Sequence, residues 1–475
     1  MKTIKRIISC IILASLIITF MPTAVSADSS VRKHFDIVVN GNNLGGIPVL
    51  DVNYDNNFFF SINAIAYYLR DTDKAFNTSI SSDEIKINMG EYCEEEPHMW
   101  GDGEYLERTK WKLAKTPVYV NGADRKYYSI ISDPDENDRR DAFFSSLRLA
   151  MLLDASVNVS NGTISINTDI PFSVSGAELE NSGYLLGVNS LLIGDGSTGR
   201  TYFEHEADRS VPIASTTKLM SYFVMMDAVS AGEVSLDDYV SISQNVVTLS
   251  EGIDGLINFK GIQSAPLSEL IVGMLISSSN ECALAIAEHV AGSEMAFVDR
   301  MNEKACELGL ENAYFYNCNG LPVYDEQLLP AKMQNHMSAR DMFILASALV
   351  NQYPQVLDIT STIKIDLPTL HYESKNTNAL AYNVEGVRGL KTGTTNKSGA
   401  CLVVCLPQEK DGEIHNLISV LFGAEGDFDR GTLSELAIRI ARDELKGETA
   451  VTEEKYTINP DNPEQDVKRM LTRLK

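Results

Sequence analysis

Two near-continuous apolar runs late in the chain constrain its fold more than any other feature. They cover residues 401–406 and 417–422, and their continuity predicts central strands that are buried on both faces. Apolar segments with helical spacing precede them at 218–231, 267–276, 283–290 and 338–351. Buried strands combined with several apolar helices predict an α/β domain in which helices cover a sheet.

This domain runs from Ser182 to Lys446 and begins with a predicted β-hairpin over residues 191–204. A short connection rich in Ser, Gly and Glu precedes it, and a polar tail, residues 447–475, follows it. At the end of the tail, apolar residues recur at helical spacing between basic ones, at Val467, Met470, Leu471 and Leu474. This pattern predicts a weak contact with a membrane surface.

Residues 28–175 form a predicted unit with an internal repeat. A strand leads into an Asn-Gly turn at Asn40 and again at Asn121, and each turn is followed by a helical pattern and a closing strand. The unit resembles the tandem copper amine oxidase N-terminal-like module, a stalk in exported proteins. The name implies no copper here, because the two histidines of the unit, His34 and His98, form no ligand cluster. We expect neither a metal nor another cofactor.

Residues 1–27 predict an export signal. Basic residues open the chain, an apolar run follows over 7–20, and the small residues Val25 and Ala27 occupy the positions before a cleavage site. The run is shorter than the about 20 residues that a spanning helix needs. We therefore expect cleavage after Ala27 and an exported protein that acts outside the cell or in its wall.

Composition argues against two classes of protein. The chain has 65 acidic and 40 basic residues and a net charge of -25, whereas a binder of nucleic acid needs a basic face. Six cysteines remain after removal of the signal, but Cys401 and Cys405 fall in one predicted strand, about 13 Å apart at about 3.3 Å per residue. That separation is too long for a disulfide between them, and we expect no disulfide framework.

Three short motifs carry the candidate chemistry. S-x-x-K occurs at Ser215–Lys218, where the serine begins an apolar helix and the lysine follows one turn later on the same face. S-x-N occurs at Ser278–Asn280, between two apolar segments. K-T-G occurs at Lys391–Gly393, before a buried strand, where glycine permits close approach of a substrate. S-x-x-K also occurs at Ser30–Lys33 and Ser361–Lys364, without the apolar helix.

In this order the motifs match the set S-x-x-K, S-x-N, K-T-G of penicillin-interacting serine enzymes. With its flanking residues the segment 182–446 resembles the serine D-Ala-D-Ala carboxypeptidases, the low-molecular-weight penicillin-binding proteins. The resemblance implies a penicillin-binding/β-lactamase-like α/β (α+β) fold, an antiparallel sheet flanked by helices with a helical subdomain. It implies removal of the terminal D-Ala from peptidoglycan stem peptides, and inhibition by β-lactam antibiotics.

The expected chemistry requires these residue types. A serine hydroxyl needs a base, and because no histidine lies in the motifs, we assign attack to Ser215 and the base to Lys218. The lysine must be neutral, so its pKa must fall from about 10.4. Burial and a second cation, Lys391, would both lower it. We assign proton relay to Ser278, while Asn280 holds the lysine and the substrate amide.

The resemblance places the oxyanion hole at the backbone N–H groups of Ser215 and Thr394. The residues expected to bind the substrate, including its carboxylate, are Lys391, Thr392, Gly393, Thr394 and Arg430. The chain departs from the Ser-Gly-Asn-Asp-Ala of relatives at Ser279, Glu281 and Cys282.

Two alternatives stay open. A class A β-lactamase needs a downstream Glu-x-x-Leu-Asn, and the nearest string, 307–311, lacks the Asn. A catalytically inactive cell-wall-binding protein would have no need to keep all three motifs intact. The type of stem peptide, endopeptidase side activity and the oligomeric state are left open at this stage.

Overall fold

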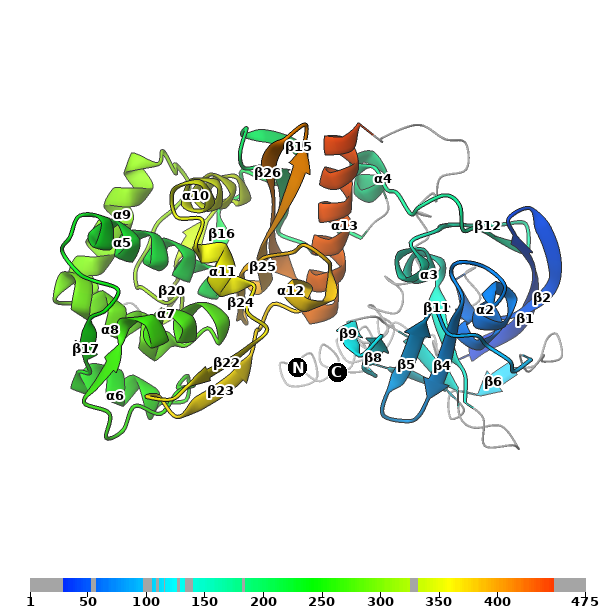
Figure 1. Ribbon diagram of the computed structural model, residues 1–475, viewed down its shortest axis with the longest axis horizontal. Helices are drawn as coiled ribbons and strands as arrows, with labels where there is room; N and C mark the ends of the chain where they lie inside the picture. Colours follow the sequence, from blue (N-terminus) through cyan, green and yellow to red (C-terminus); the bar gives the residue numbers. More distant parts are fainter. Residues whose placement is uncertain are drawn as a thin grey trace, which may run out of the picture.

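The computed structural model shows two lobes (Figure 1). The first contains the motif-bearing domain, and the second contains the repeated unit. The described residues are 29–52, 57–96, 105–107, 111–114, 116–125, 129–132, 140–181, 184–324 and 332–447. The predicted export signal and the residues predicted to contact a membrane lie outside these ranges.

The motif-bearing lobe is built around a five-stranded antiparallel sheet in the order β15-β14-β26-β25-β24. Its strands are β14 (Ser190–Asp195), β15 (Arg200–His205), β24 (Leu390–Thr395), β25 (Gly399–Lys410) and β26 (Glu413–Ala424). The hairpin and the two buried strands predicted from the sequence are confirmed. β24 carries K-T-G and is an edge strand, so among the described residues one of its sides has no strand partner.

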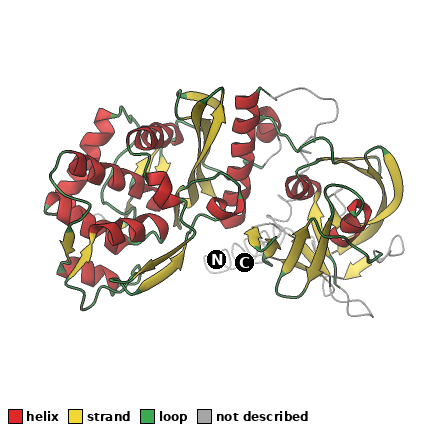
Figure 2. Cartoon of the chain, in the orientation of Figure 1, coloured by secondary structure: helices red, strands yellow, loops and turns green. Residues whose placement is uncertain are grey.

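Helices cover both faces of this sheet (Figure 2). α13 (Asp427–Lys446) lies along one face, where its buried Leu436 and Ile440 belong to the same apolar cluster as Leu402 and Val404 of β25. The other face carries the helical subdomain, made of α5 (Lys218–Ser230), α6 (Gln244–Ser250), α7 (Leu267–Ile276), α8 (Asn280–Ala291), α9 (Glu294–Glu307), α10 (Ala339–Gln352) and α11 (Val356–Thr360). All four helices predicted from apolar spacing are present.

The repeated unit contains two halves with the same element order. The first half is β1 (Ser29–Val39), β2 (Asn42–Val52), β3 (Asn57–Ser61), α2 (Ile62–Leu69), β4 (Phe76–Ile80) and β5 (Ile85–Met89). The second is β8 (Val118–Val120), β9 (Ala123–Arg125), β10 (Ser129–Ser132), β11 (Ala142–Ser145), α3 (Ser146–Leu153), β12 (Ser156–Ser160) and β13 (Thr163–Asn167), with β10 as an added strand. A serine caps each helix, since Ser61 accepts a hydrogen bond from Ala64 N–H and Ser145 from Arg148 N–H.

The two halves are interlocked. β1 pairs in parallel with β13, with Asp36 opposite Thr163, and β5 pairs in parallel with β8, with Ile85 opposite Val118. The opening strand of each half thus joins the closing strand of the other half. Neither half keeps its own separate sheet, so we expect the two to fold as one unit.

The repeated unit packs against α13. Apolar side chains of both form one cluster, to which Phe172, Val174 and Leu179 of the connecting segment belong. Arg439 of α13 forms an ion pair with Asp154 at 2.6 Å, and its guanidinium carbon lies 5.4 Å from the centre of the Phe172 ring. The connection predicted to be short and polar therefore contributes buried apolar contacts through these three side chains.

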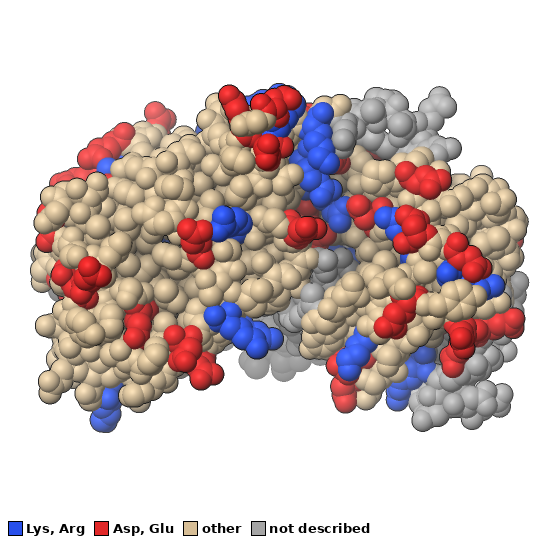
Figure 3. Space-filling model, in the orientation of Figure 1, with Lys and Arg blue, Asp and Glu red and all other residues tan. Residues whose placement is uncertain are grey.

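Basic side chains gather over α13 on the face shown in Figure 3, at the junction of the two lobes. α13 carries Arg439, Arg442 and Lys446. Acidic side chains are spread over both lobes on this face. None of the helices in the described parts of the chain is both long and apolar enough to cross a membrane.

Candidate active site

Ser215 and Lys218 come together where a short 3-10 helix, η2 (Ala214–Thr217), continues into α5. Ala214 precedes the serine with φ +48°, a left-handed conformation that is costly for a residue with a Cβ. Lys218 Nζ lies 2.9 Å from Ser215 Oγ. The half-buried serine thus has the amine of a fully buried lysine as its hydrogen-bond partner.

Lys218 has two further partners, and both can only accept. Its Nζ donates to Asn280 Oδ1 and to the backbone oxygen of Asn319, each at 2.8 Å. A neutral amine has two N–H groups and one lone pair. With both N–H groups donated to these oxygens, the lone pair faces Ser215 Oγ–H, which is the arrangement that a general base needs.

Burial lowers the pKa of Lys218 to about 7. The neighbouring groups Cys318, Glu281 and Cys282 act in the opposite direction and raise this pKa. Burial also lowers the pKa of Lys391 well below its usual value, and the charges of Lys218 and Arg430 lower it further. Burial, rather than the Lys391 cation, is therefore the main cause of the shift at Lys218.

The K-T-G strand lies directly against the nucleophile. A Cβ on Gly393 would come within 2.9 Å of Ser215 N and 3.0 Å of Thr216 N, closer than real Cβ contacts. Glycine at this position is therefore required for β24 to approach η2. Lys391 is buried on the same strand, and its Nζ donates to the backbone oxygen of Thr392 at 3.0 Å.

The S-x-N motif forms the turn between α7 and α8. Ser278 is half-buried with φ +67°, and Ser279 caps α8 by accepting a hydrogen bond from Cys282 N–H at 3.1 Å. Asn280 begins the helix and contacts Lys218 as described above. Two of the predicted motifs are thus joined by a direct hydrogen bond, and the third is packed against the serine.

Arg430 reaches the end of β24 from the first turns of α13. Its Nη1 donates to Thr394 Oγ1 at 3.1 Å and to the backbone oxygen of Gly393 at 3.3 Å. Thr392 Oγ1 lies 2.7 Å from Thr377 Oγ1. The predicted substrate-binding residues therefore lie on β24 and, for Arg430, in the first turns of α13.

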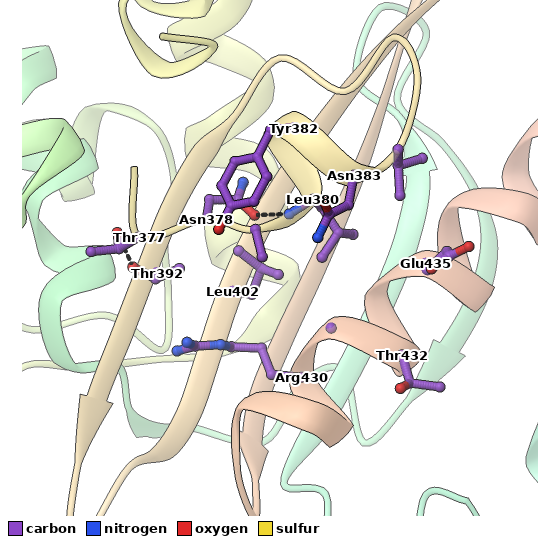
Figure 4. A pocket seen from close by; sticks show the side chains of 13 residues that line it. Thr377, Asn378, Leu380, Tyr382, Asn383, Thr392, Leu402, Arg430, Thr432 and Glu435 are labelled. Atoms are coloured by element: carbon purple, nitrogen blue, oxygen red, sulfur yellow. Dashed lines mark hydrogen bonds between the residues drawn. The ribbon is translucent and has the colours of Figure 1, made fainter. Parts of the chain in front are cut away.

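A pocket with a volume of about 350 Å³ opens beside these residues (Figure 4). Its lining comes from the segment that contains α12 (Leu380–Asn383), from β24 and β25, and from the start of α13. Among the lining residues are Thr377, Tyr382, Thr392, Arg430 and Glu435. Two of these, Thr392 and Arg430, are also predicted to bind the substrate, so the pocket adjoins the place expected for the substrate carboxylate.

Several functional residues were missed by the sequence analysis. Asn319 contributes a backbone oxygen, for which a sequence has no direct signal. Gly320 has φ +90°, and a Cβ there would lie 2.0 Å from Ala214 O. Asn335 supports this loop, since its Nδ2 donates to Thr217 Oγ1 at 3.0 Å and to Asn317 O at 2.9 Å. The Asn-Gly pair was the one available signal for a tight turn.

The S-x-x-K string at Ser361–Lys364 has no such surroundings. Lys364 is exposed, and Ser361 Oγ donates to the backbone oxygen of Asp358 at 3.1 Å. Within the described ranges, no three side chains of His, Cys, Asp or Glu come together as a metal site. The six cysteines are free thiols.

Comparison with known proteins agrees with the geometry. Residues 182–426 match the family model for D-alanyl-D-alanine carboxypeptidase. D-alanyl-D-alanine carboxypeptidase DacF of Bacillus subtilis is 31% identical over 237 residues, which are 49% of this chain and 56% of that protein. The D-alanyl-D-alanine endopeptidase of Pseudomonas aeruginosa is 31% identical over 46% of this chain and 67% of its own length.

Among solved structures, penicillin-binding protein D2 of Listeria monocytogenes in its cefotaxime-bound form is similar, with 25% identity and a TM-score of 0.47. That similarity covers 54% of this chain and 96% of that chain. The chain spans little more than half the length of DacF.

Proposed function

Because the chain belongs to the D-alanyl-D-alanine carboxypeptidase family, whose penicillin-binding/β-lactamase-like fold it shares, we propose that it trims peptidoglycan as a serine-type carboxypeptidase. Its proposed substrate is a stem peptide that ends in D-Ala-D-Ala. One observation carries the proposal: the buried Lys218 Nζ contacts Ser215 Oγ and two oxygens that can only accept. This arrangement supports a lysine that takes the serine proton.

The reaction begins when Ser215 Oγ attacks the carbonyl carbon of the penultimate D-Ala, and its proton moves to Lys218 Nζ. The resulting oxyanion is held by the backbone N–H groups of Ser215 and Thr394, and loss of one such donor typically costs about 3 kcal/mol. The terminal D-Ala leaves when its amine receives a proton through Ser278. Water then hydrolyses the acyl-enzyme, and the serine recovers its proton.

The substrate is held at its free carboxylate. Arg430 bonds to Thr394 and lies at the end of β24, and Thr392 is on the same strand. The Arg430 guanidinium supplies positive charge at this end of the strand, whereas burial lowers the pKa of Lys391. β-Lactam antibiotics carry a carboxylate as well and are expected to acylate the same serine.

Two measurements test this proposal together. A fluorescent penicillin should label the protein covalently, with peptide mapping placing the adduct on Ser215, and a D-Ala-D-Ala peptide should release free D-Ala. Ser215→Ala should abolish both, whereas Ser361→Ala, in the string without a buried lysine, should change neither. Rapid turnover of penicillin would favour the β-lactamase alternative. Absence of both labelling and D-Ala release would favour an inactive cell-wall-binding protein.

The pocket beside Thr392 and Arg430 favours a second activity, the cleavage of cross-linked peptides. A terminal alanine carries only a methyl side chain, whereas the pocket has a volume of about 350 Å³. A cross-link leaves a larger amino acid next to the scissile bond, and its longer side chain would enter this space. Assaying a cross-linked peptide in parallel with the D-Ala-D-Ala peptide gives the ratio of the two activities.

For residues 28–175 we propose a spacer or wall-contact role, consistent with their resemblance to copper amine oxidase N-terminal-like modules. A chain truncated to begin at Ser175 should hydrolyse a soluble D-Ala-D-Ala peptide with kcat/KM within about threefold of the longer chain. Its Tm should be lower, because truncation removes Asp154 and Phe172 and exposes the apolar face of α13. A folded truncated protein with a tenfold loss of kcat/KM would instead show that the module contributes to the site.

Location outside the cell is also a proposal. It rests on the export-signal pattern of residues 1–27, and membrane contact rests on the amphipathic pattern of residues 467–474. Both segments lie outside the described residues, so both stay predictions from the sequence.

A further inference from the structure

The buried carboxylate of Glu281 is a part of the site that the mechanism above does not use. Glu281 lies in the first turn of α8 and has no exposed surface. Its Oε1 accepts hydrogen bonds from the backbone N–H groups of Leu256 and Ile257, the latter at 3.3 Å. Its Oε2 accepts a hydrogen bond from Ser279 Oγ at 2.6 Å. All three partners donate, which suits an ionised carboxylate.

The two backbone bonds attach a surface loop to the helix that carries the S-x-N motif. The loop, residues 251–257, follows α6 and is exposed at its tip, where the side chain of Ile253 is fully exposed to solvent. Ile257 is buried at its end. Hydrogen bonds inside the loop are local, from Gly252 N–H to Leu249 O and from Gly255 N–H to Gly252 O. Glu281 therefore supplies side-chain contacts that hold the loop against α8.

The same loop contacts Asn280. Asn280 Nδ2 donates to the backbone oxygen of Asp254 at 3.3 Å, while its Oδ1 accepts from Lys218 Nζ at 2.8 Å. A carbonyl oxygen cannot donate, so contact with Asp254 O selects the amide orientation in which Nδ2 faces the loop. The other orientation would turn an N–H group toward the amine of Lys218. The loop carbonyl therefore favours the same orientation of the Asn280 amide that the contact with Lys218 requires.

We propose that Glu281 is a positioning residue for this reaction: it holds loop 251–257 so that Asp254 O fixes the orientation of the Asn280 amide, and through it Lys218. The inference rests on the proposed function, because it assumes that Lys218 is the base for Ser215. Asn280 and Glu281 are adjacent at the start of α8 and hold the same loop at two points, one through a carbonyl and one through N–H groups. We call these contacts of Asn280 and Glu281 with loop 251–257 the clamp. The clamp links an exposed loop to the catalytic lysine.

Charge gives the clamp a second, separable effect. The groups that act on the pKa of Lys218 are Cys318, Glu281 and Cys282, all of which raise it against the effect of burial. The charge of Lys218 in turn lowers the pKa of Lys391 on β24. Loss of the Glu281 charge should therefore lower the pKa of Lys218. The acid limb of the pH profile of acylation, where the rate rises with pH, should then move to lower pH.

Three variants separate position from charge. Glu281→Gln keeps an oxygen that can accept the loop N–H groups but removes the charge, so the loop should stay protected and only the acid limb should move. Leu256→Pro deletes one donated N–H at an exposed residue and keeps the charge. It should speed hydrogen exchange of residues 251–259 and lower the acylation rate by about tenfold or more, without moving the acid limb. Glu281→Ala should show faster hydrogen exchange, a lower acylation rate and a shifted acid limb.

Glu288→Gln is the matched control, because Glu288 lies two turns along the same helix and bonds to Asn245 instead of the loop. It should match the wild type in every measurement. If Glu281→Ala does not fold, Leu256→Pro decides the question. Unchanged hydrogen exchange in Leu256→Pro would overturn the clamp, and faster exchange with an unchanged acylation rate would overturn its effect on Asn280. Failure of the wild type both to react with penicillin and to release D-Ala is a separate result, which refutes the proposed function and leaves the exchange measurement interpretable.

Discussion

Replacing Lys218 with alanine is expected to lower the rate constant for acylation of Ser215 by about 10³-fold or more, since a positioned general base contributes up to about 10⁴-fold. The serine would keep its place in η2, just before α5, but lose the group that takes its proton. Stopped-flow measurement of acylation by a fluorescent penicillin gives this rate constant directly. Tm of the same sample shows whether the loss reflects chemistry or unfolding.

Lys364→Ala is the matched control, because Lys364 also follows a serine by three residues but is exposed. It should leave the acylation rate unchanged. In the wild type the rate should rise with pH through about 7, where the buried lysine loses its proton and becomes a base. A rise of the acylation rate only near pH 10 would contradict a lowered lysine pKa. Equal rates in Lys218→Ala and Lys364→Ala would refute the assignment of the base.

Gly320→Ala is expected to reduce acylation by about 10²-fold, the size of effect that small displacements of catalytic groups produce. The new Cβ would lie 2.0 Å from Ala214 O, far inside van der Waals contact, so one of two backbone segments must move. One segment leads into Ser215, and the other carries the Asn319 oxygen that binds Lys218. Either movement breaks the contact geometry of the base. The acylation rate constant and Tm are the measurements.

Gly292→Ala separates this clash from backbone strain. Gly292 ends α8 with φ +78°, close to the +90° of Gly320, but nothing lies within 4 Å of its would-be Cβ. The control should therefore lower stability by about 1 kcal/mol and leave acylation unchanged. Equal loss of acylation in the two variants would mean that strain elsewhere in the fold, rather than contact with Ala214, limits the reaction.

Much of the motif-bearing lobe was predictable because its signals are local. The runs 401–406 and 417–422 are apolar on every residue or nearly so, and only a strand covered on both faces buries such a run. Ser338 followed by Asp341 marks a helix start, and Ser338 Oγ accepts a hydrogen bond from Asp341 N–H at 3.0 Å. The motif residues Ser215 and Lys218 were predictable for the same reason, since a spacing of three places them on one helix face.

The repeated unit shows where local signals end. The two Asn-Gly turns, the two helices and the closing strands are all present as expected, and both Asn40 and Asn121 have φ +49°. Yet nothing in either half indicates that the opening strand of one pairs with the closing strand of the other. That exchange depends on contacts between residues more than 100 positions apart in β1 and β13, for which periodicity has no signal.

By itself the sequence determined the elements, the motifs and their order, because helix and strand periods and turn residues act over a few neighbours. Only the tertiary structure decided which oxygens surround Lys218, that Glu281 holds the loop beside Asn280, and that the repeated unit packs on α13 through Arg439. These features join backbone atoms and side chains that are distant in the chain. Burial of the lysine, and with it the fall of its pKa to about 7, exists only once those segments pack together.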